Sequence, residues 1–368
     1  MRNLLIVLAA TAIVVAGCKA DSGAPVNISV DTQADASLEI CKGAKIDNIF
    51  SLSDTLLVGE VSKAQHHNGK LYVWDKSSKG ILCYDLEGNL LFNINSVGRG
   101  PEEYTGISNF YLSGRKNTVN IIAPEKKLLE YCANTGELLS VSQIGAQTIM
   151  FTDGAEHPLG GNVLGIVGPK HNLAICGTDS ITYHIPFNMA RDFCFMEKAF
   201  ANDGEQLLFV HGMDNNIYAV GADSVAVKYI ADFGGLEISN ADYETLTPQK
   251  IQEIYSAREV ATRVDNLVST PYFLAFSYWK MYPNKEQQTQ YALYNKKNGE
   301  VLGIKENILF PIKCAAGDHF ISIIGNPAEI LNLPPDKTSG IPQKLREYLT
   351  DGKFAPESNP VVVVWGIL

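Results

Sequence analysis

The chain has 368 residues, of which 46% are hydrophobic and 19% are charged, and its formal net charge is −10 at pH 7. This composition is typical of a globular protein with a large core and excludes an intrinsically disordered chain. The acidic balance also excludes nucleic acid as an expected partner, because nucleic-acid binding needs a basic surface that displaces phosphate counterions.

Residues 1–17 have the pattern of a secretory signal peptide. Arg2 precedes an apolar run of about a dozen residues, and small residues end the segment. The sequence Val15-Ala16-Gly17-Cys18 matches the lipobox of bacterial lipoproteins. We therefore expect cleavage before Cys18 and lipidation of its thiol, which would hold the protein at a membrane without a spanning helix. An ordinary cleaved signal followed by a cysteine is the alternative.

Residues 18–36 are small and polar and show no sustained helical or strand period. We expect them to form a flexible tether between the lipidated Cys18 and a single domain over 37–368. Lys19, directly after the cysteine, favours the outer membrane over the inner membrane. The sequence leaves open whether the protein faces the periplasm or the outside.

Six of the seven cysteines lie beyond Cys18. They form no Cys-x-x-Cys pair and no tight disulfide framework, so free thiols are favoured over disulfides. These residues are Cys41, Cys83, Cys132, Cys176, Cys194 and Cys314.

The stretch from 68 to 104 contains the most informative pattern. Alternating apolar segments at 68–75 and 81–94 predict strands separated by turns. They lead into Gly98-Arg99-Gly100-Pro101-Glu102-Glu103-Tyr104, in which two glycines and a proline favour a rigid, shaped loop. The succession resembles the first complete blade of the six-bladed β-propeller lipoproteins of Bacteroides, a TolB-like or NHL-like family of unknown function. The resemblance implies an all-β propeller with four-stranded antiparallel blades and an envelope location, and it implies no substrate.

A repeat supports the same architecture. An aromatic residue, a polar turn and an apolar alternation recur along the chain, with turn residues at Gly88, Gly136, Asp179, Asp223 and Gly299. The steps between these turns are 48, 43, 44 and 76 residues, and a period near 45 residues is typical of propeller blades. We expect the sixth blade to combine strands from both ends of the chain, with residues 50–61 supplying the closing strand.

The long fourth step predicts a helical insertion over 240–268. Thr247 and Pro248 provide a helix cap and a first-turn proline, and apolar residues that include Val260 and Val264 fit one helical face. Without about 29 inserted residues the step returns to the common period. A second, short helix is predicted at 342–350.

Catalytic signatures of hydrolases, zinc proteases, phosphate-binding loops and EF-hands are absent from the sequence. We therefore predict no catalytic residue, no metal and no cofactor. His66 and His67 are candidate metal ligands, but no carboxylate or cysteine lies at a ligand spacing beside them, so a loop histidine pair is favoured.

The candidate ligand-binding residues are Arg99, Glu102, Glu103 and Tyr104. An arginine fork binds carboxylates or sugar hydroxyls, the glutamates would be its polar partners, and the tyrosine would offer a stacking face. The alternative is structural: Arg99 and Glu103 would pair with neighbouring blades and Tyr104 would pack between them.

Two functions remain open. The lipid anchor and the missing catalytic motifs favour an envelope-anchored, monomeric and non-catalytic module that binds or scaffolds a protein partner or a glycan, through one face and the 240–268 insertion. The alternative is a propeller hydrolase or lyase acting on glycans or lactones, with acidic or histidine residues of several blades converging at the central tunnel.

Overall fold

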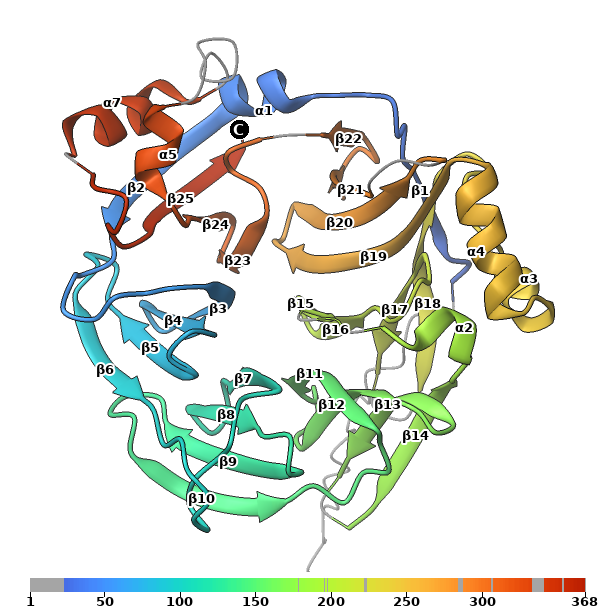
Figure 1. Ribbon diagram of the computed structural model, residues 1–368, viewed down its shortest axis with the longest axis horizontal. Coiled ribbons are helices and arrows are strands. Elements are labelled where there is room, and N and C mark those ends of the chain that lie inside the picture. The colour runs from blue at the N-terminus through green and yellow to red at the C-terminus, as the bar shows by residue number, and fades with distance from the viewer. Residues whose placement is uncertain are drawn as a thin grey trace, which may run out of the picture.

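The computed structural model describes residues 23–367 apart from residues 178, 195, 197, 222–223, 284–286, 306, 333–340 and 353. Its strands form six sheets, which surround a central axis as blades (Figure 1). Five sheets have four strands and one has five. The six-bladed β-propeller predicted from the repeat is therefore confirmed.

Each blade contributes one strand to each of four concentric rings. We number the blades 1 to 6 in the order in which their innermost strands occur along the chain. The innermost strands are β3 (Val61–His67), β7 (Asn109–Ser113), β11 (Met150–Glu156), β15 (Phe200–Asp203), β19 (Val260–Ser269) and β23 (Ile312–Ala316). The second strands are β4 (Lys70–Asp75), β8 (Thr118–Ile122), β12 (Asn162–Val167), β16 (Gln206–Phe209), β20 (Phe273–Met281) and β24 (His319–Ile324). The third strands are β5 (Gly80–Tyr84), β9 (Lys127–Cys132), β13 (His171–Cys176), β17 (Asn216–Val220), β21 (Gln288–Asn295) and β25 (Val361–Ile367). The fourth strands are β6 (Leu90–Ile94), β10 (Leu138–Gln143), β14 (Ile181–Pro186), β18 (Val225–Asp232), β22 (Val301–Ile304) and β2 (Ala44–Ser51).

The predicted turn residues fall where the repeat requires them, between the third and fourth strands. Gly88, Gly136 and Gly299 have φ values of 89°, 73° and 77°, a region that favours glycine. Asp179 occupies the equivalent turn of blade 3, and Asp223 lies outside the described residues. The feature that recurs from blade to blade is thus the tight connection before the outermost strand.

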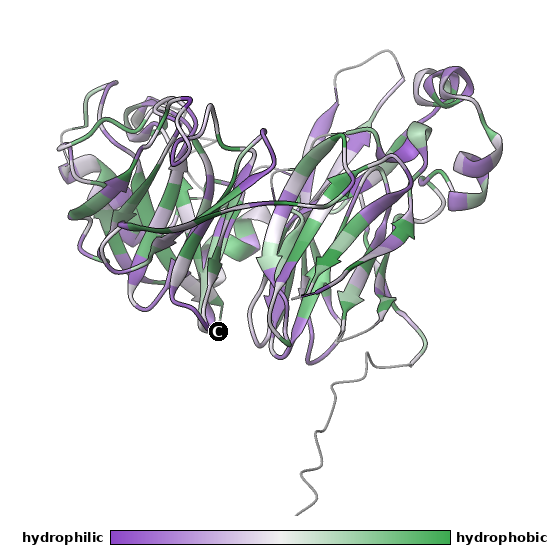
Figure 2. Cartoon of the chain, turned by 90° about the horizontal axis from the view of Figure 1, so that it is seen from below, coloured by the Kyte–Doolittle hydropathy of each residue, from purple (hydrophilic) through white to green (hydrophobic). Residues whose placement is uncertain are grey.

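The core consists of side chains packed between neighbouring blades. Tyr72 and Trp74 of blade 1 share one cluster with Phe110 and Ile121 of blade 2. Because both faces of each sheet are covered, strands such as β5 and β8 are buried along their whole length. Figure 2 shows hydrophobic residues concentrated within the strands and hydrophilic residues towards their ends. Burial of each large apolar side chain contributes about 1.5–3 kcal/mol to the free energy of unfolding.

The ring is closed by a strand from the N-terminal part of the chain. β2 pairs antiparallel with β25 and completes blade 6. The closing strand is therefore 44–51, and the prediction of 50–61 was wrong over most of its length. Residues 52–60 instead form a connection held by Asn359, whose Oδ1 accepts from Val58 N at 2.8 Å and whose Nδ2 donates to Ser53 O and Leu56 O at 2.7 Å each. The apolar spacing in this connection reflects packing of Leu52 and Val58, which are buried.

Residues 23–36, which we call the strap, run along the outside of blades 4 and 5. β1 (Val26–Ser29) pairs parallel with β18 and adds a fifth strand to blade 4. Further along, Lys280 Nζ donates to Thr32 O at 3.3 Å and Ala36 N donates to Gly303 O at 2.8 Å. The prediction of a flexible tether is thus wrong for 26–36, because Ile28 and Val30 are buried against the outer edge of the sheet.

The predicted insertion is helical only in its first part. α3 (Asn240–Thr245) begins at a capping box formed by Ser239 and Asp242, and α4 (Pro248–Ala257) begins at the Thr247 cap. Residues 260–268, predicted as helix, belong to β19 instead. This strand has register shifts around Arg263 and Asn266, whose φ values are 60° and 52°. The resulting bulges disturb the strand alternation and give its apolar residues a spacing that resembles a helical one.

Helices outside the insertion are short. α7 (Gln343–Asp351) confirms the prediction at 342–350, whereas α1 (Ser37–Gly43), α2 (Met189–Asp192) and α5 (Pro327–Leu331) were not predicted. α5 and α7 lie beside β2 at the outer edge of blade 6 (Figure 1). Over the part of the chain that is described, no helix is long and apolar enough to cross a membrane.

The two faces of the ring differ in what they carry. At the face where the innermost strands end and turn back, which we call the mouth face, short hairpins surround the axis. At the opposite face, which we call the connector face, each outermost strand leads to the next blade. α3 and α4 follow the end of β18 and therefore belong to the connector face.

Candidate functional site

The 98–104 loop connects blade 1 to blade 2 and has a largely structural role in its second half. Tyr104 is fully buried, and its hydroxyl donates to Lys79 O at 3.0 Å. Glu103 Oε2 accepts from Gly100 N at 2.7 Å, and a Cβ at Gly98 would lie 1.9 Å from that same carboxylate oxygen. The glycines of the loop therefore make room for the Glu103 carboxylate.

Lys127 of blade 2 fixes the same loop from the other side. Its ammonium donates to Gly100 O and Glu103 O, each at 3.0 Å. Arg99 and Glu102 are exposed. Of the four predicted ligand-binding residues, these two are accessible on the connector face, while Glu103 and Tyr104 contribute to the joint between blades. Ligand binding by this loop stays a prediction.

A larger concave site lies on the axis and opens at the mouth face. It is a cavity of about 910 Å³, within the size range of small-ligand pockets. All six innermost strands or the turns after them line it. The lining residues fall in the segments 63–67, 111–115, 154–159, 198–207, 267–269 and 314–317. Residues 113, 199, 203 and 316 of these segments do not line the cavity.

The lining combines apolar walls with polar groups at the rim. Ala155, Phe200, Leu267 and Val268 are among the apolar lining residues. The side-chain amides among the lining residues belong to Gln65, Asn202 and Gln206, the hydroxyls to Tyr111 and Ser269, and the carboxylates to Glu156 and Glu205. Some of these groups are held by the scaffold, since Gln65 Oε1 accepts from Leu112 N at 2.8 Å and Glu156 Oε1 accepts from Ser113 Oγ at 2.7 Å.

A buried ion pair joins the blades at the inner end of this cavity. Lys63 Nζ lies 2.5 Å from Asp153 Oδ1, and both side chains are at most 2% exposed. The Lys63 ammonium also donates to Asn109 Oδ1 and Phe110 O at 2.9 Å each, while Asp153 Oδ2 accepts from Ala199 N at 2.8 Å. Blades 1, 2, 3 and 4 thus meet in one network. Removal of one partner from such a buried pair typically costs about 3–5 kcal/mol.

Two further lysines bridge blades around the same axis. Lys313 Nζ of blade 6 donates to Val61 O at 3.0 Å, and Lys198 Nζ, which precedes β15, donates to Ile312 O at 3.3 Å and to Lys313 O at 2.5 Å. Burial, together with the positive charges of Lys313 and Lys63, lowers the pKa of Lys198 to about 7. This amine therefore changes its charge near neutral pH.

His66 and His67 also line the cavity, at the end of β3. His66 Nε2 is buried and has no hydrogen-bond partner among the described residues. Burial lowers the pKa of His66, and the neighbouring His67 adds to the effect. The sequence-based idea of a metal site at this pair finds no support in the geometry, since no group of three or more His, Cys, Asp or Glu in the described chain could hold a metal ion.

The cysteines do not form a reactive centre. All six described cysteines are free thiols, as the spacing favoured. Cys314 lines the cavity, and burial raises its pKa to about 12, so it is a neutral thiol at physiological pH.

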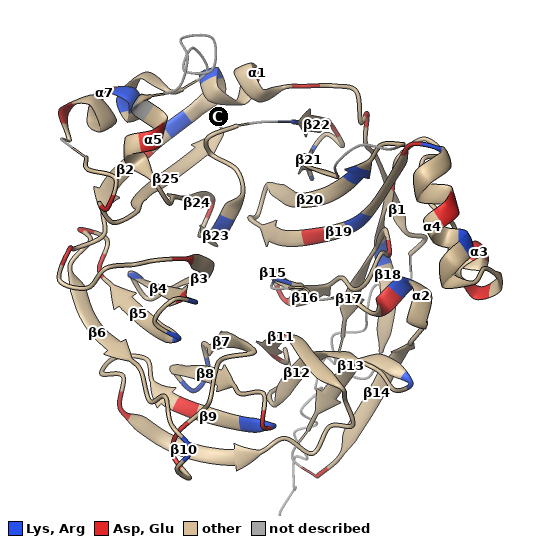
Figure 3. Cartoon of the chain, viewed as in Figure 1, with Lys and Arg blue, Asp and Glu red and all other residues tan. Residues whose placement is uncertain are grey.

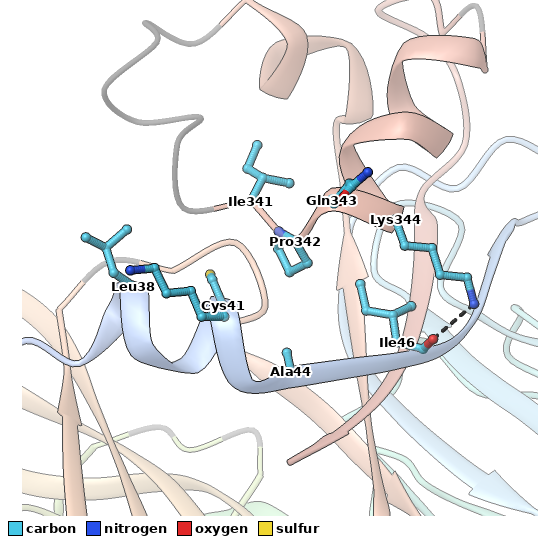
Figure 4. Close-up of a pocket in the computed structure, with 9 residues that line it drawn as sticks. Leu38, Cys41, Ala44, Ile46, Ile341, Pro342, Gln343 and Lys344 are labelled. Atoms are coloured by element: carbon cyan, nitrogen blue, oxygen red, sulfur yellow. Dashed lines mark hydrogen bonds between the residues drawn. The ribbon is translucent and has the colours of Figure 1, made fainter. Parts of the chain in front are cut away.

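A second, smaller pocket of about 380 Å³ lies between α1 and α7. Figure 4 shows Leu38 and Cys41 on one side and Ile341 and Pro342 on the other. Lys344 Nζ donates to Ile46 O at 3.0 Å and joins α7 to the closing strand. Its position at the outer edge of blade 6 makes this pocket part of the closure of the ring.

Sequence reasoning missed the cavity residues Gln65, Lys198, Asn202 and Ser269. Their only signal in the sequence is position, because each lies in or directly beside a segment that becomes an innermost strand. The repeat was recognised at the turns before the outermost strands, and it did not show which segments face the axis.

The comparisons with known proteins agree with this fold. A family model described as "Domain of unknown function (DUF4934)" matches residues 53–365. None of the curated proteins matches the sequence.

Two solved structures from Bacteroides are similar over most of the chain. A candidate exported protein from Bacteroides fragilis is 16% identical, with a TM-score of 0.72, over 94% of this chain and 100% of that chain. A DUF4221 family member from Bacteroides vulgatus is 11% identical, with a TM-score of 0.52, over 88% of this chain and 98% of that chain. At these identities the likeness shows the fold alone. The resemblance to propellers of exported Bacteroides proteins is confirmed, while the TolB-like or NHL-like subtype stays a prediction.

Proposed function

The chain belongs to the DUF4934 family, and on that premise we propose that it is an envelope-anchored, non-catalytic module that binds a glycan in its central cavity. The observation that carries the proposal is the cavity of about 910 Å³ on the axis, to which all six blades contribute. The lipobox at Cys18 supports anchoring to the envelope, most simply as an outer-membrane lipoprotein.

The rim chemistry favours a glycan over an extended protein surface. Asn202 presents an exposed side-chain amide, which both donates and accepts hydrogen bonds as sugar hydroxyls require. The amide nitrogens of Gln65 and Gln206 add donors, while their oxygens accept from Leu112 N and from Lys228 Nζ. Phe200, which is 8% exposed, offers an apolar surface to the face of a sugar ring. A protein partner that engages the connector face, through Arg99, Glu102 and the α3–α4 insertion, is the competing mode of binding.

Non-catalytic binding is favoured by the state of the candidate reactive groups. Cys314 is protonated at physiological pH, and both carboxylate oxygens of Asp153 are occupied by Lys63 and by backbone amides of the scaffold. A hydrolase or lyase needs an acid and a base free to act on the ligand. Two features favour the enzyme alternative, namely acidic and histidine residues of several blades that line the cavity, such as Glu205 and His67, and the lowered pKa of Lys198. Assays of glycan and lactone turnover test it.

The proposal is tested with the soluble chain from residue 19 onward, screened for binding to an array of envelope glycans. Asn202→Trp should block the cavity from its exposed rim and abolish binding, whereas Arg99→Ala on the opposite face should leave the affinity unchanged. Circular dichroism shows whether both variants fold. If Arg99→Ala abolishes binding and Asn202→Trp does not, the ligand uses the connector face and the cavity proposal is wrong. Turnover of the bound glycan at ordinary enzymatic rates would contradict the non-catalytic role.

A further inference from the structure

The inner end of the cavity carries more positive than negative charge, although the whole chain has a net charge of −10. Asp153 is the carboxylate beside Lys63, and its two oxygens are already used. Oδ1 lies 2.5 Å from Lys63 Nζ and accepts from Gly154 N at 2.7 Å, while Oδ2 accepts from Ala199 N and Phe200 N at 2.8 Å and 3.1 Å. Asp153 therefore neutralises Lys63 and has no free lone pair directed to a second cation.

Lys198 is the second cation at this level. Its ammonium donates to two backbone carbonyls, Ile312 O and Lys313 O. No carboxylate of the described residues lies within 4.0 Å of it, and its side chain is among those that line the cavity. An ammonium has three N–H donors, so two carbonyl contacts leave one donor available. The two peptide carbonyls solvate the charge of this buried group directly, and Asp153 acts on it electrostatically without touching it.

His66 supplies a second unused polar atom in the same place. Its Nε2 is buried without a partner, and its ring lines the cavity from blade 1. Lys198 reaches blade 6 at Ile312 O and Lys313 O, and Cys314, the next residue of that strand, lines the same cavity as His66. An unpaired buried imidazole nitrogen destabilises the folded state, and a ligand atom that hydrogen-bonds to it removes that penalty.

We propose that Lys198 and His66 bind an anionic group, a carboxylate or a phosphate, on the ligand that enters the central cavity. This inference rests on the proposed glycan-binding function and narrows it to acidic glycans. A charge-assisted hydrogen bond from the ammonium and one from the imidazole N–H would satisfy both free donors at once. In a chain with a large negative charge elsewhere, this pair makes the axis selective for anions.

Anion binding is expected to be linked to protonation. The groups that act on Lys198 are Lys63 of β3, Asp153 of β11, and Lys313 and Cys314 of β23, with His66 lining the same cavity. Burial and the two neighbouring lysines lower the pKa of Lys198 to about 7, and an anion beside the amine would raise it again. Affinity for the anion should therefore be highest below about pH 7 and fall as the pH rises above it.

The test uses the folded soluble chain labelled with ¹⁵N at histidine and titrated with acetate, inorganic phosphate and galactose at pH 6. The His66 resonances are assigned with His66→Gln. Acetate or phosphate should shift the His66 ring signals in a saturable manner, the response should weaken at pH 9, and galactose should not reproduce it. Acetate and phosphate distinguish the two kinds of anionic group.

Lys198→Met provides the matched variant, because it keeps an unbranched side chain of similar size and removes the ammonium group with its N–H donors. It should weaken anion binding by about 10- to 100-fold, the range of a charge-assisted hydrogen bond. No shift with either anion up to about 50 mM, in the range of weak binding, overturns the proposal, and so does unchanged anion affinity in a folded Lys198→Met. Glycan binding that is equally strong for acidic and neutral sugars would overturn this inference and leave the proposed function intact.

Discussion

His211 shows how single buried residues hold the insertion on the ring. Its Nδ1 lies 3.2 Å from Asp192 Oδ1 and its Nε2 lies 3.3 Å from Asp214 Oδ2, with all three side chains at most 5% exposed. Arg191 donates to Asp192 at 2.6 Å and to Asn240 of α3 at 3.0 Å. The network therefore links blade 4 to the start of the insertion.

We expect the stability of this network to depend on pH in a defined direction. Burial disfavours the charged imidazole, but hydrogen bonds to Asp192 and Asp214 outweigh it and raise the pKa of His211 above 6.5. A raised folded-state pKa gives stability that is complete below about pH 6.5 and is lost as pH rises through the folded-state pKa. The difference in free energy of unfolding between the wild type and His211→Gln should therefore shrink from pH 6 to pH 9. Urea denaturation at several pH values measures it, and a difference that grows with pH would contradict the assignment.

The functional residues were less predictable than the fold, for a physical reason. The 98–104 loop has a recognisable sequence because glycines and a proline are required by its shape, and Glu103 and Tyr104 satisfy that shape from inside. Lys198 has no such local signature, and the His66-His67 pair suggests a metal site rather than an anion site. Their importance comes from side chains of blades 1, 3, 4 and 6 that meet on the axis, and those blades are far apart in the sequence.

At the scale of elements, regular strands were predictable and irregular ones were not. The alternation and Gly turns of blades 1 and 2 give clear strand boundaries. β19 was predicted as helix because its bulges at Arg263 and Asn266 break the alternation. β1 was predicted as tether because only Ile28 of its four residues is buried, which leaves no apolar alternation in the sequence. In both cases pairing with a distant partner strand, rather than local preference, determines the structure.

The strap should make a measurable contribution to stability. Ile28 is fully buried, whereas its neighbour Asn27 is exposed. We expect Ile28→Ala to lower the free energy of unfolding by about 2–4 kcal/mol, as for other buried Ile-to-Ala changes. Asn27→Ala is the matched control and should have little effect. Chemical denaturation compares the two variants, and equal stabilities would mean that the strap does not dock on blade 4 in solution.

At the scale of the whole molecule, ring closure depends on residues outside the part of the chain that the family model matches. That match begins at residue 53, but the outermost strand of blade 6 is β2, at 44–51. A chain without β2 would leave the backbone of β25 unpaired along its outer side. Open strand edges of this kind promote association between molecules.

A fragment of residues 53–368 should therefore aggregate or associate, whereas a fragment of residues 23–368, which keeps the strap, α1 and β2, should remain a monomer. Size-exclusion chromatography with light scattering distinguishes the two outcomes. Attraction between oppositely charged regions does not account for association of the 53–368 fragment, because acidic and basic residues are interspersed around the ring (Figure 3). A monomeric, fully folded 53–368 fragment would show that closure by β2 is dispensable.

The direction of the strap has a consequence for how the molecule would stand on a bilayer. β1 runs parallel to β18, and β18 starts at the mouth face, so the chain reaches blade 4 from the side on which the cavity opens. Eight residue steps separate Cys18 from Val26, a reach of at most about 29 Å. With the proposed lipid on Cys18, the cavity would open into a narrow layer above the membrane. The cavity would then meet molecules attached to that same membrane at a high local concentration. The small distance between the cavity and the membrane would exclude large soluble molecules.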